Sequence, residues 1–370
     1  MYVRPISELW QMWAPRIKAH TYPFPYATYE DMEKVMTSLT SYDRDKWAAA
    51  FSAVAKPYED NAVQAEKAGD AKTAKENYLK AYQYYRIARF PTINSEGKKA
   101  AYRKSQEMVL RAAKYSEFPL ERVEIPFAGK TGEGSNIVAY VRVPKLGKAP
   151  FPVLIGWGGI DGFKEEQVQN DGPLAVGLAM IAIDGPGVGD SPLKGSEDAE
   201  RLFGAVLDWV GKDKRFDSKR IAVWGQSTGG YWAVKVAHVF KDRVACAVSQ
   251  GGPVHYSFQM DWIKKQEFGE YAFEVFDTLS FAFGRAGYDD WVRYAPKLSL
   301  LKQGVIDKPC APLLLVNGLH DSLFTIQDYY LLLEHGSPKS ARFYDVGHMG
   351  YTPDTIPMIM GWVREKLGIK

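Results

Sequence analysis

The chain has little of what marks several classes of protein. Its 370 residues include only two cysteines, Cys246 and Cys310. This excludes a disulfide framework and a four-cysteine zinc site, and it is typical of a reducing compartment. No stretch approaches the roughly 18 consecutive apolar residues of a membrane span, and the N-terminus lacks a basic segment followed by an apolar one. We therefore expect a cytoplasmic protein with no membrane association.

An excess of one charge is also missing. Lys and Arg total 47 against 44 Asp and Glu, which leaves a formal net charge of +3. Without a dense basic run, this balance argues against nucleic-acid binding. No H-E-x-x-H motif or His/carboxylate cluster at metal-ligand spacing occurs, and the glycine-rich segments 129–134 and 185–190 match neither a P-loop nor a dinucleotide motif. The sequence therefore predicts no metal and no cofactor.

The first third of the chain is helical in pattern. Between Asp43 and Phe118, Ala, Tyr, Leu and Ile return every three or four residues, as they do in helices with one buried stripe. Gly69 and Asp70 divide this stretch into a pair of helices, and Pro91 ends the second one. We expect residues 1–118 to form a helical accessory domain.

After Pro119 short apolar runs alternate with amphipathic stretches, which is typical of βαβ units and a mostly parallel sheet. The sequence therefore predicts an α/β domain over residues 119–370. Some sixty helical, aromatic residues separate the sixth and seventh strands, which is too long for a plain crossover. We expect a helical cap insertion over 253–308. The predicted strands cover 123–127, 137–143, 153–157, 180–184, 221–224, 244–249, 313–316 and 342–345.

One motif indicates nucleophilic catalysis. Residues 225–229 read G-Q-S-T-G, with the strand RIAVW before them and the helix YWAVKVAHVF after them. The G-x-S-x-G nucleophile elbow requires this context, because the serine occupies a strained turn between a strand and a helix. A side chain at either glycine would collide with neighbouring elements. We interpret Ser227 as a nucleophile; the alternative is a plain Gly/Ser turn.

A serine nucleophile needs a base, and the base needs an orienting carboxylate. Of the six histidines, His348 directly follows the last predicted strand and is flanked by glycines. Asp321 follows the seventh predicted strand, so the chain order is Ser, Asp, His, as in α/β-hydrolases. Asp345 is the rival acid, but it lies within a strand. We predict a triad of Ser227, Asp321 and His348.

An oxyanion hole needs two N–H groups that point at the developing negative charge. One should come from Thr228, which follows the nucleophile, and the other from Ile160 in the W-G-G-I-D-G segment after the third predicted strand. Gly159 is the fallback for the second donor, and an ordinary glycine turn is the alternative for the segment. Candidate substrate contacts are two residues of this segment and two at the start of the cap: Gly159, Asp161, His255 and Tyr256.

The segments YLKAYQYYRIARFP, ERVEIPF, GGIDGFKEE, AIDGPGVGDSP, KRIAVWGQSTGGYWAVKVA and GLHDSL together resemble one branch of the α/β-hydrolases. That branch includes 2,6-dihydroxypseudooxynicotine hydrolase, fungal heptaketide-shortening pigment hydrolases and the esterase-like proteins named for a fermentation–respiration switch. The resemblance covers roughly residues 70–350. It implies a cytoplasmic, commonly dimeric enzyme whose N-terminal helices help to close the active site. By resemblance the triad falls on Ser227, His348 and Asp321.

These observations lead to a functional hypothesis. We expect a serine hydrolase of the α/β-hydrolase fold that cleaves a bond next to a carbonyl, either an ester or, as in some members of the branch, a C–C bond beside an aryl ketone. The aromatic content of 14% suits a flat or apolar small-molecule substrate. Two alternatives remain: an acyl transferase or lyase that uses the same triad, and a non-catalytic scaffold that has kept the fold.

Overall fold

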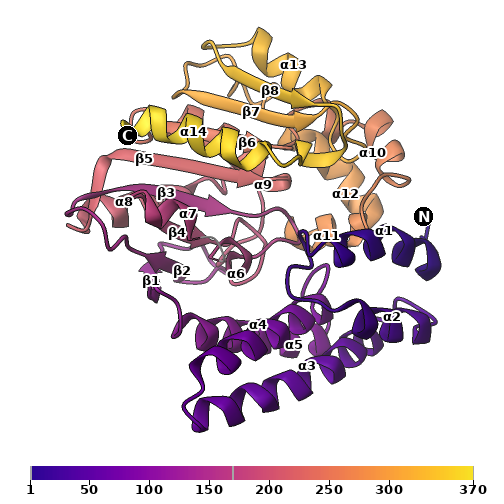
Figure 1. The fold of residues 1–370 in the computed structure, drawn as a ribbon. Helices are drawn as coiled ribbons and strands as arrows, with labels where there is room; N and C mark the ends of the chain where they lie inside the picture. The colour runs from indigo at the N-terminus through magenta and orange to yellow at the C-terminus, as the bar shows by residue number, and fades with distance from the viewer. Residues whose placement is uncertain (1, 169–170, 370) are drawn as a thin grey trace. The chain divides into compact units, whose positions relative to one another are not determined.

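The computed structural model describes residues 2–168 and 171–369 (Figure 1). The chain forms two compact units. The helical unit comprises Met1–Leu120 together with Ala272–Glu274, and the sheet unit comprises Glu121–Tyr271 and Val275–Lys370.

The helical unit contains three long helices that lie side by side in Figure 1. As the sequence predicts, Gly69 and Asp70 separate a pair of them. Asp70 accepts a hydrogen bond from the backbone N–H of Thr73 and so caps the second helix of that pair. This helix ends shortly before Pro91, as expected. The helices of the unit are α1 (Ile6–Lys18), α2 (Tyr29–Ser38), α3 (Arg44–Lys67), α4 (Ala71–Ala88) and α5 (Glu96–Ala113).

A short segment from much later in the chain completes the core of the helical unit. The ring of Phe273 stacks on Tyr42 with the ring centroids 4.4 Å apart. It also packs against Trp47 at 4.8 Å and Phe90 at 5.4 Å. Aromatic pairs at such distances add to the free energy gained from burying their area. This explains why Ala272–Glu274 belongs to the helical unit.

The sheet unit is built on eight strands in the order β1-β2-β4-β3-β5-β6-β7-β8. β2 pairs antiparallel with β4, and the pairings from β4 through β8 are parallel. The predicted mostly parallel eight-stranded sheet is therefore confirmed. The strands are β1 (Leu120–Pro126), β2 (Asn136–Arg142), β3 (Phe151–Trp157), β4 (Ala179–Ile183), β5 (Phe216–Gln226), β6 (Cys246–Gln250), β7 (Leu313–Gly318) and β8 (Ser340–Tyr344).

Both faces of the sheet are buried along the central strands β3, β4, β6 and β7. Alternate residues of each strand point to opposite faces. In β3, Val153 and Ile155 belong to the core that α8 (Arg201–Lys212) and α9 (Thr228–Val239) share. Leu154 belongs to a second core with α14 (Thr355–Leu367). Such two-sided burial is why the strands read as short apolar runs in the sequence.

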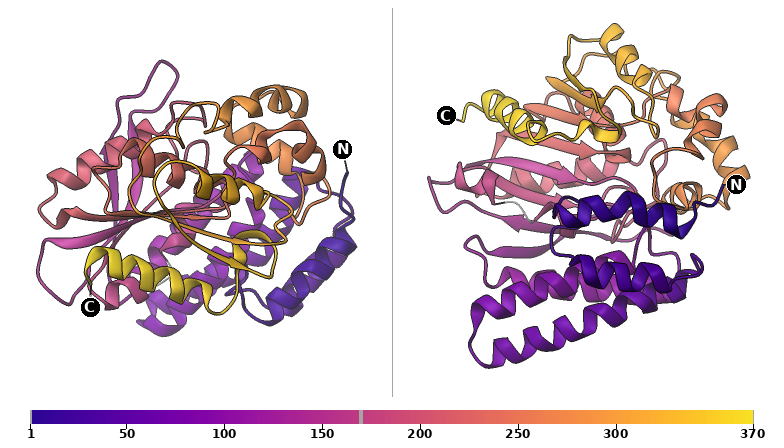
Figure 2. Two further views of the ribbon diagram at one scale, coloured as in Figure 1. Left: turned by 90° about the horizontal axis from the view of Figure 1, so that it is seen from above. Right: turned by 45° about the vertical axis from the view of Figure 1, so that its right-hand side comes forward.

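The insertion between β6 and β7 is helical, as expected. Its helices lie beyond the carboxyl ends of the central strands in both Figure 1 and Figure 2. In open α/β sheets ligands bind at this edge. The insertion contains η1 (Tyr256–Phe258), α10 (Met260–Gln266), α11 (Val275–Ala282), α12 (Tyr288–Tyr294) and η2 (Ala295–Leu298).

Candidate active site

Ser227 occupies a strained turn between β5 and α9. Its backbone has φ 53° and ψ −131°, a left-handed conformation that costs a non-glycine residue of order 1–3 kcal/mol. The flanking glycines make this turn possible. A Cβ at Gly225 would lie 2.1 Å from the carbonyl oxygen of Gly229, and one at Gly229 would lie 2.3 Å from that of Gly158. The turn therefore has the geometry that the G-x-S-x-G pattern requires.

The structure brings together the three residues that the sequence predicts as a triad. His348 Nε2 lies 2.8 Å from Ser227 Oγ, and His348 Nδ1 lies 2.8 Å from Asp321 Oδ2. These residues follow β5, β7 and β8, so the sheet carries all three at one edge. The rival acid, Asp345, lies elsewhere: its side chain is 87% exposed and pairs with His320 Nε2 at 2.6 Å.

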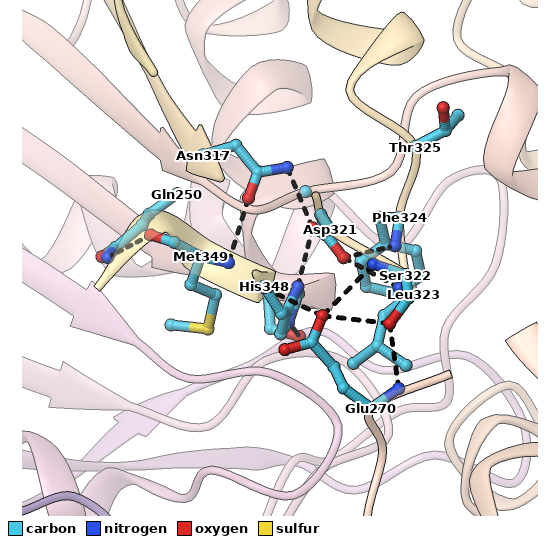
Figure 3. Close-up of polar contacts among 12 residues, drawn as sticks. Gln250, Glu270, Asn317, Asp321, Ser322, Leu323, Phe324, Thr325, His348 and Met349 are labelled. Carbon is cyan, nitrogen blue, oxygen red and sulfur yellow. Dashed lines mark hydrogen bonds and ion pairs between the residues drawn. The ribbon is translucent and has the colours of Figure 1, made fainter. Parts of the chain in front are cut away.

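The carboxylate of Asp321 is held by several donors (Figure 3). Its Oδ1 accepts hydrogen bonds from the backbone N–H groups of Leu323 at 2.8 Å and Phe324 at 2.9 Å. Its Oδ2 accepts a hydrogen bond from Asn317 Nδ2 at 2.9 Å. Asn317 Oδ1 in turn accepts from the N–H of Met349, next to the histidine. Sequence reasoning missed Asn317, whose only signal is a polar residue near the end of an apolar strand.

The charges around His348 favour its protonated form. Burial alone would lower the pKa of this imidazole, but the charge of Asp321 and its hydrogen bond outweigh that effect. The carboxylates of Glu270 and Asp161 act in the same direction as Asp321, and the net pKa of His348 is raised. Such surroundings stabilise the imidazolium that forms when the histidine takes a proton.

The loop after β3 passes directly beside Ser227. A Cβ at Gly159 would lie 2.7 Å from Ser227 Cβ and 3.0 Å from its Oγ. Ile160, the next residue, is buried, as is Thr228 at the start of α9. The loop is thus close enough to the nucleophile for an oxyanion hole, and the roles of the two N–H groups stay predictions.

A buried cluster of charges fixes the far end of this loop, and sequence reasoning did not find it. Lys164 Nζ lies 2.9 Å from Asp184, 2.7 Å from Asp190 and 3.0 Å from Glu165. The backbone N–H of Lys164 also donates to Asp184 at 2.8 Å. Because Asp184 directly follows β4, these bonds tie the loop to the neighbouring strand. A buried ammonium group needs such partners.

The start of the insertion is anchored by a buried carboxylate. Asp328 accepts hydrogen bonds from the backbone N–H groups of residues 254–257. His255 Nδ1 lies 2.7 Å from Ser299 Oγ, and its ring contacts that of Tyr256. Substrate binding by His255, Tyr256, Gly159 and Asp161 stays a prediction.

Residues 2–168 and 171–369 contain neither a metal-binding cluster nor a membrane-spanning helix. No group of three or more His, Cys, Asp or Glu side chains there could hold a metal ion. No helix in the same ranges has the length and apolar character needed to cross a membrane.

Comparison with known proteins identifies the family. Residues 27–335 match the family described as "Esterase FrsA-like". The chain belongs to the FrsA-like esterase family. This confirms the predicted place in that branch of the α/β-hydrolases, and the protein is an enzyme of the α/β-hydrolase fold.

Individual relatives of the FrsA-like chain agree with this assignment. It is 28% identical to 2,6-dihydropseudooxynicotine hydrolase of Paenarthrobacter nicotinovorans over 303 residues. The matched region covers 80% of this chain and 76% of the relative. The chain is 23% identical over 317 residues to Esterase FrsA of Photorhabdus laumondii, with 83% and 73% covered. The crystal structure of 2,6-dihydroxy-pseudo-oxynicotine hydrolase is 22% identical, with a TM-score of 0.76 over 96% of this chain and 95% of the other, and shows the same fold.

Proposed function

We propose that this FrsA-like protein is a serine hydrolase in which Ser227 attacks a substrate carbonyl and forms an acyl-enzyme. One observation carries the proposal: Ser227 Oγ, the His348 ring and the Asp321 carboxylate form a hydrogen-bonded chain, with 2.8 Å at both links. A nucleophile, a base and an orienting group in this order are the arrangement that activates a serine.

The proposed reaction has two halves. His348 Nε2 takes the proton of Ser227 as its oxygen bonds to the carbonyl carbon, while Asp321 orients the imidazolium through Nδ1–H. The N–H groups of Thr228 and Ile160 stabilise the oxyanion. The bond from the carbonyl carbon to the leaving group then breaks, and His348 gives its proton to that group. Water repeats these steps on the acyl-enzyme, which releases a carboxylic acid and restores Ser227.

The bond that breaks is an ester or a C–C bond of an aryl ketone or polyketide-like compound. The leaving group of an ester is an alkoxide, which the histidine protonates. A carbon leaving group must spread its negative charge, for example into a phenolic ring. The relatives named Esterase FrsA and 2,6-dihydropseudooxynicotine hydrolase both support hydrolysis, and the first name specifies an ester.

The test compares the wild-type protein with the Ser227→Ala variant. Ser218→Ala is the matched control, because Ser218 is exposed on the same strand. Short-chain p-nitrophenyl esters and an acylated polyhydroxybenzene serve as substrates, with products identified by mass spectrometry. We expect Ser227→Ala to lower kcat by several orders of magnitude, and the control to match wild type.

The products decide between the alternatives. A carboxylic acid released from the aryl ketone establishes C–C hydrolysis, whereas release only from esters establishes a carboxylesterase. Transfer of the acyl group to an added alcohol without acid formation would indicate a transferase. If Ser227→Ala matched wild type on every compound that is turned over, the proposal would be wrong.

A further inference from the structure

Glu270 connects two of the loops that form the candidate active site. It lies in the insertion between β6 and β7, and its Oε1 accepts a hydrogen bond from the backbone N–H of His348 at 3.0 Å. The same oxygen accepts from the N–H of Ser322 at 3.2 Å and from Ser322 Oγ at 3.0 Å. Figure 3 shows the carboxylate between the two loops.

These contacts act on the proposed triad through the backbone. His348 is the proposed base itself, and Ser322 directly follows the proposed acid, Asp321. The bond between Glu270 and Ser322 is reciprocal, because Ser322 Oγ also accepts from the N–H of Glu270 at 2.9 Å. One carboxylate thus holds the loop after β7 and the loop after β8 at a fixed separation.

The fit around this carboxylate is close. A Cβ added at Gly347, directly before the histidine, would lie 2.6 Å from Glu270 Oε2. The carboxylate is the end of a flexible side chain, so a methyl group at residue 347 would displace it.

We propose that Glu270 is a positioning residue that holds His348 and Asp321 in the register required for proton transfer. The inference rests on the proposed function, since it concerns the same triad. Glu270 makes its contacts through Ser322 and the backbone of His348, so it acts through other residues. Misplacing reacting groups by about 1 Å can cost on the order of 10²-fold in rate.

The charge of Glu270 provides a second, separable effect. Three carboxylates act on the His348 ring: those of Asp321, Glu270 and Asp161. Glu270→Gln keeps an oxygen to accept the three hydrogen bonds but removes the negative charge. The imidazolium is then less stabilised, so the acidic limb of kcat/KM moves to lower pH. Glu270→Ala removes both the charge and the hydrogen bonds.

The experiment measures kcat and KM of both variants on a p-nitrophenyl ester across pH. Asp261→Asn is the matched control, because this carboxylate is exposed on α10 of the same insertion. We expect Glu270→Ala to lose about 10- to 100-fold in kcat with KM little changed. Glu270→Gln should keep kcat within about threefold at its optimum and shift the acidic limb, and the control should change neither.

A double-mutant cycle that combines Glu270→Ala with Gly347→Ala tests the same contacts. It does not require that either single variant keep its full stability. Gly347→Ala should lower kcat in the presence of Glu270 and have a much smaller effect in the Glu270→Ala background, because the obstructing carboxylate is gone. Additive losses would overturn the proposal. So would a Glu270→Ala variant with wild-type kcat, or one in which only KM changes.

Ser227→Ala separates failure of this inference from failure of the proposed function. If Ser227→Ala abolishes turnover while the Glu270 variants match wild type, only the role of Glu270 is refuted. If Ser227→Ala retains activity, the triad itself is wrong.

Discussion

The hydrogen bonds of Asp321 predict a severe defect for its amide analogue. In the Asp321→Asn variant, one terminal atom is an oxygen and the other is an NH₂ group. The Oδ1 position receives two backbone N–H donors, from Leu323 at 2.8 Å and Phe324 at 2.9 Å, so the amide oxygen must lie there. The NH₂ group then takes the Oδ2 position, where it faces His348 Nδ1.

This arrangement forces the wrong tautomer on the histidine. An NH₂ group donates, so His348 Nδ1 must accept and the ring proton moves to Nε2. Nε2 then donates to Ser227 Oγ, 2.8 Å away, and can no longer take its proton. Loss of the base in this way costs about 10⁴-fold in kcat, which corresponds to about 5.4 kcal/mol in the activation free energy.

The assay is kcat/KM on p-nitrophenyl esters, with circular dichroism to show that the variant is folded. Asp345→Asn is the control, because it makes the same chemical change at the rival acid, which is exposed and pairs with His320. We expect the control to stay within about twofold of wild type, as for surface substitutions away from special features. The assignment of Asp321 would be refuted if kcat/KM of Asp321→Asn stayed within tenfold of wild type. It would also be refuted if Asp345→Asn lost more activity than Asp321→Asn.

Three further predictions concern pH, the elbow and the helical unit. Only neutral imidazole accepts a proton, so kcat/KM should fall as pH falls through the pKa of His348. Since that pKa is raised, the midpoint of the fall should lie above the ordinary value of 6.5. A midpoint below 6.5 would contradict the argument from the neighbouring carboxylates. Gly229→Ala places a Cβ 2.3 Å from the carbonyl oxygen of Gly158 and should cost on the order of 10²-fold in kcat; unchanged kinetics would show that the turn adapts. Phe273→Ala should lower the free energy of unfolding of the helical unit by about 3–5 kcal/mol in a denaturant titration, whereas Phe268→Ala, 70% exposed, should leave it nearly unchanged; equal effects would exclude a role for the buried stacking.

Much of the fold and of the candidate site could be predicted because the signals are local. The alternation of apolar runs predicts the strands, and G-Q-S-T-G predicts the strained turn at Ser227. Asp321 and His348 could be predicted from their places after strands, because the carboxyl ends of parallel strands meet at one edge of a sheet. The structure does bring these three side chains together.

The supporting residues could not be predicted, because their partners are far away in the chain. Asp328 binds backbone N–H groups about 70 residues earlier, and Glu270 binds the N–H of His348, 78 residues later. Phe273 reads as part of the cap, yet it belongs to the core of the helical unit. No spacing or period in the sequence marks these contacts.

The sequence by itself therefore determined which elements form and which residue types follow each strand, since backbone propensity, alternation and glycine geometry act between near neighbours. Only the tertiary structure decided which carboxylate meets His348. Asp321 Oδ2 lies 2.8 Å from His348 Nδ1, whereas Asp345 is exposed and pairs with His320. The tertiary structure also decided which groups hold that pair in place. The physical reason is that a hydrogen bond depends on distance in space, and the chain sets that distance only after it has folded.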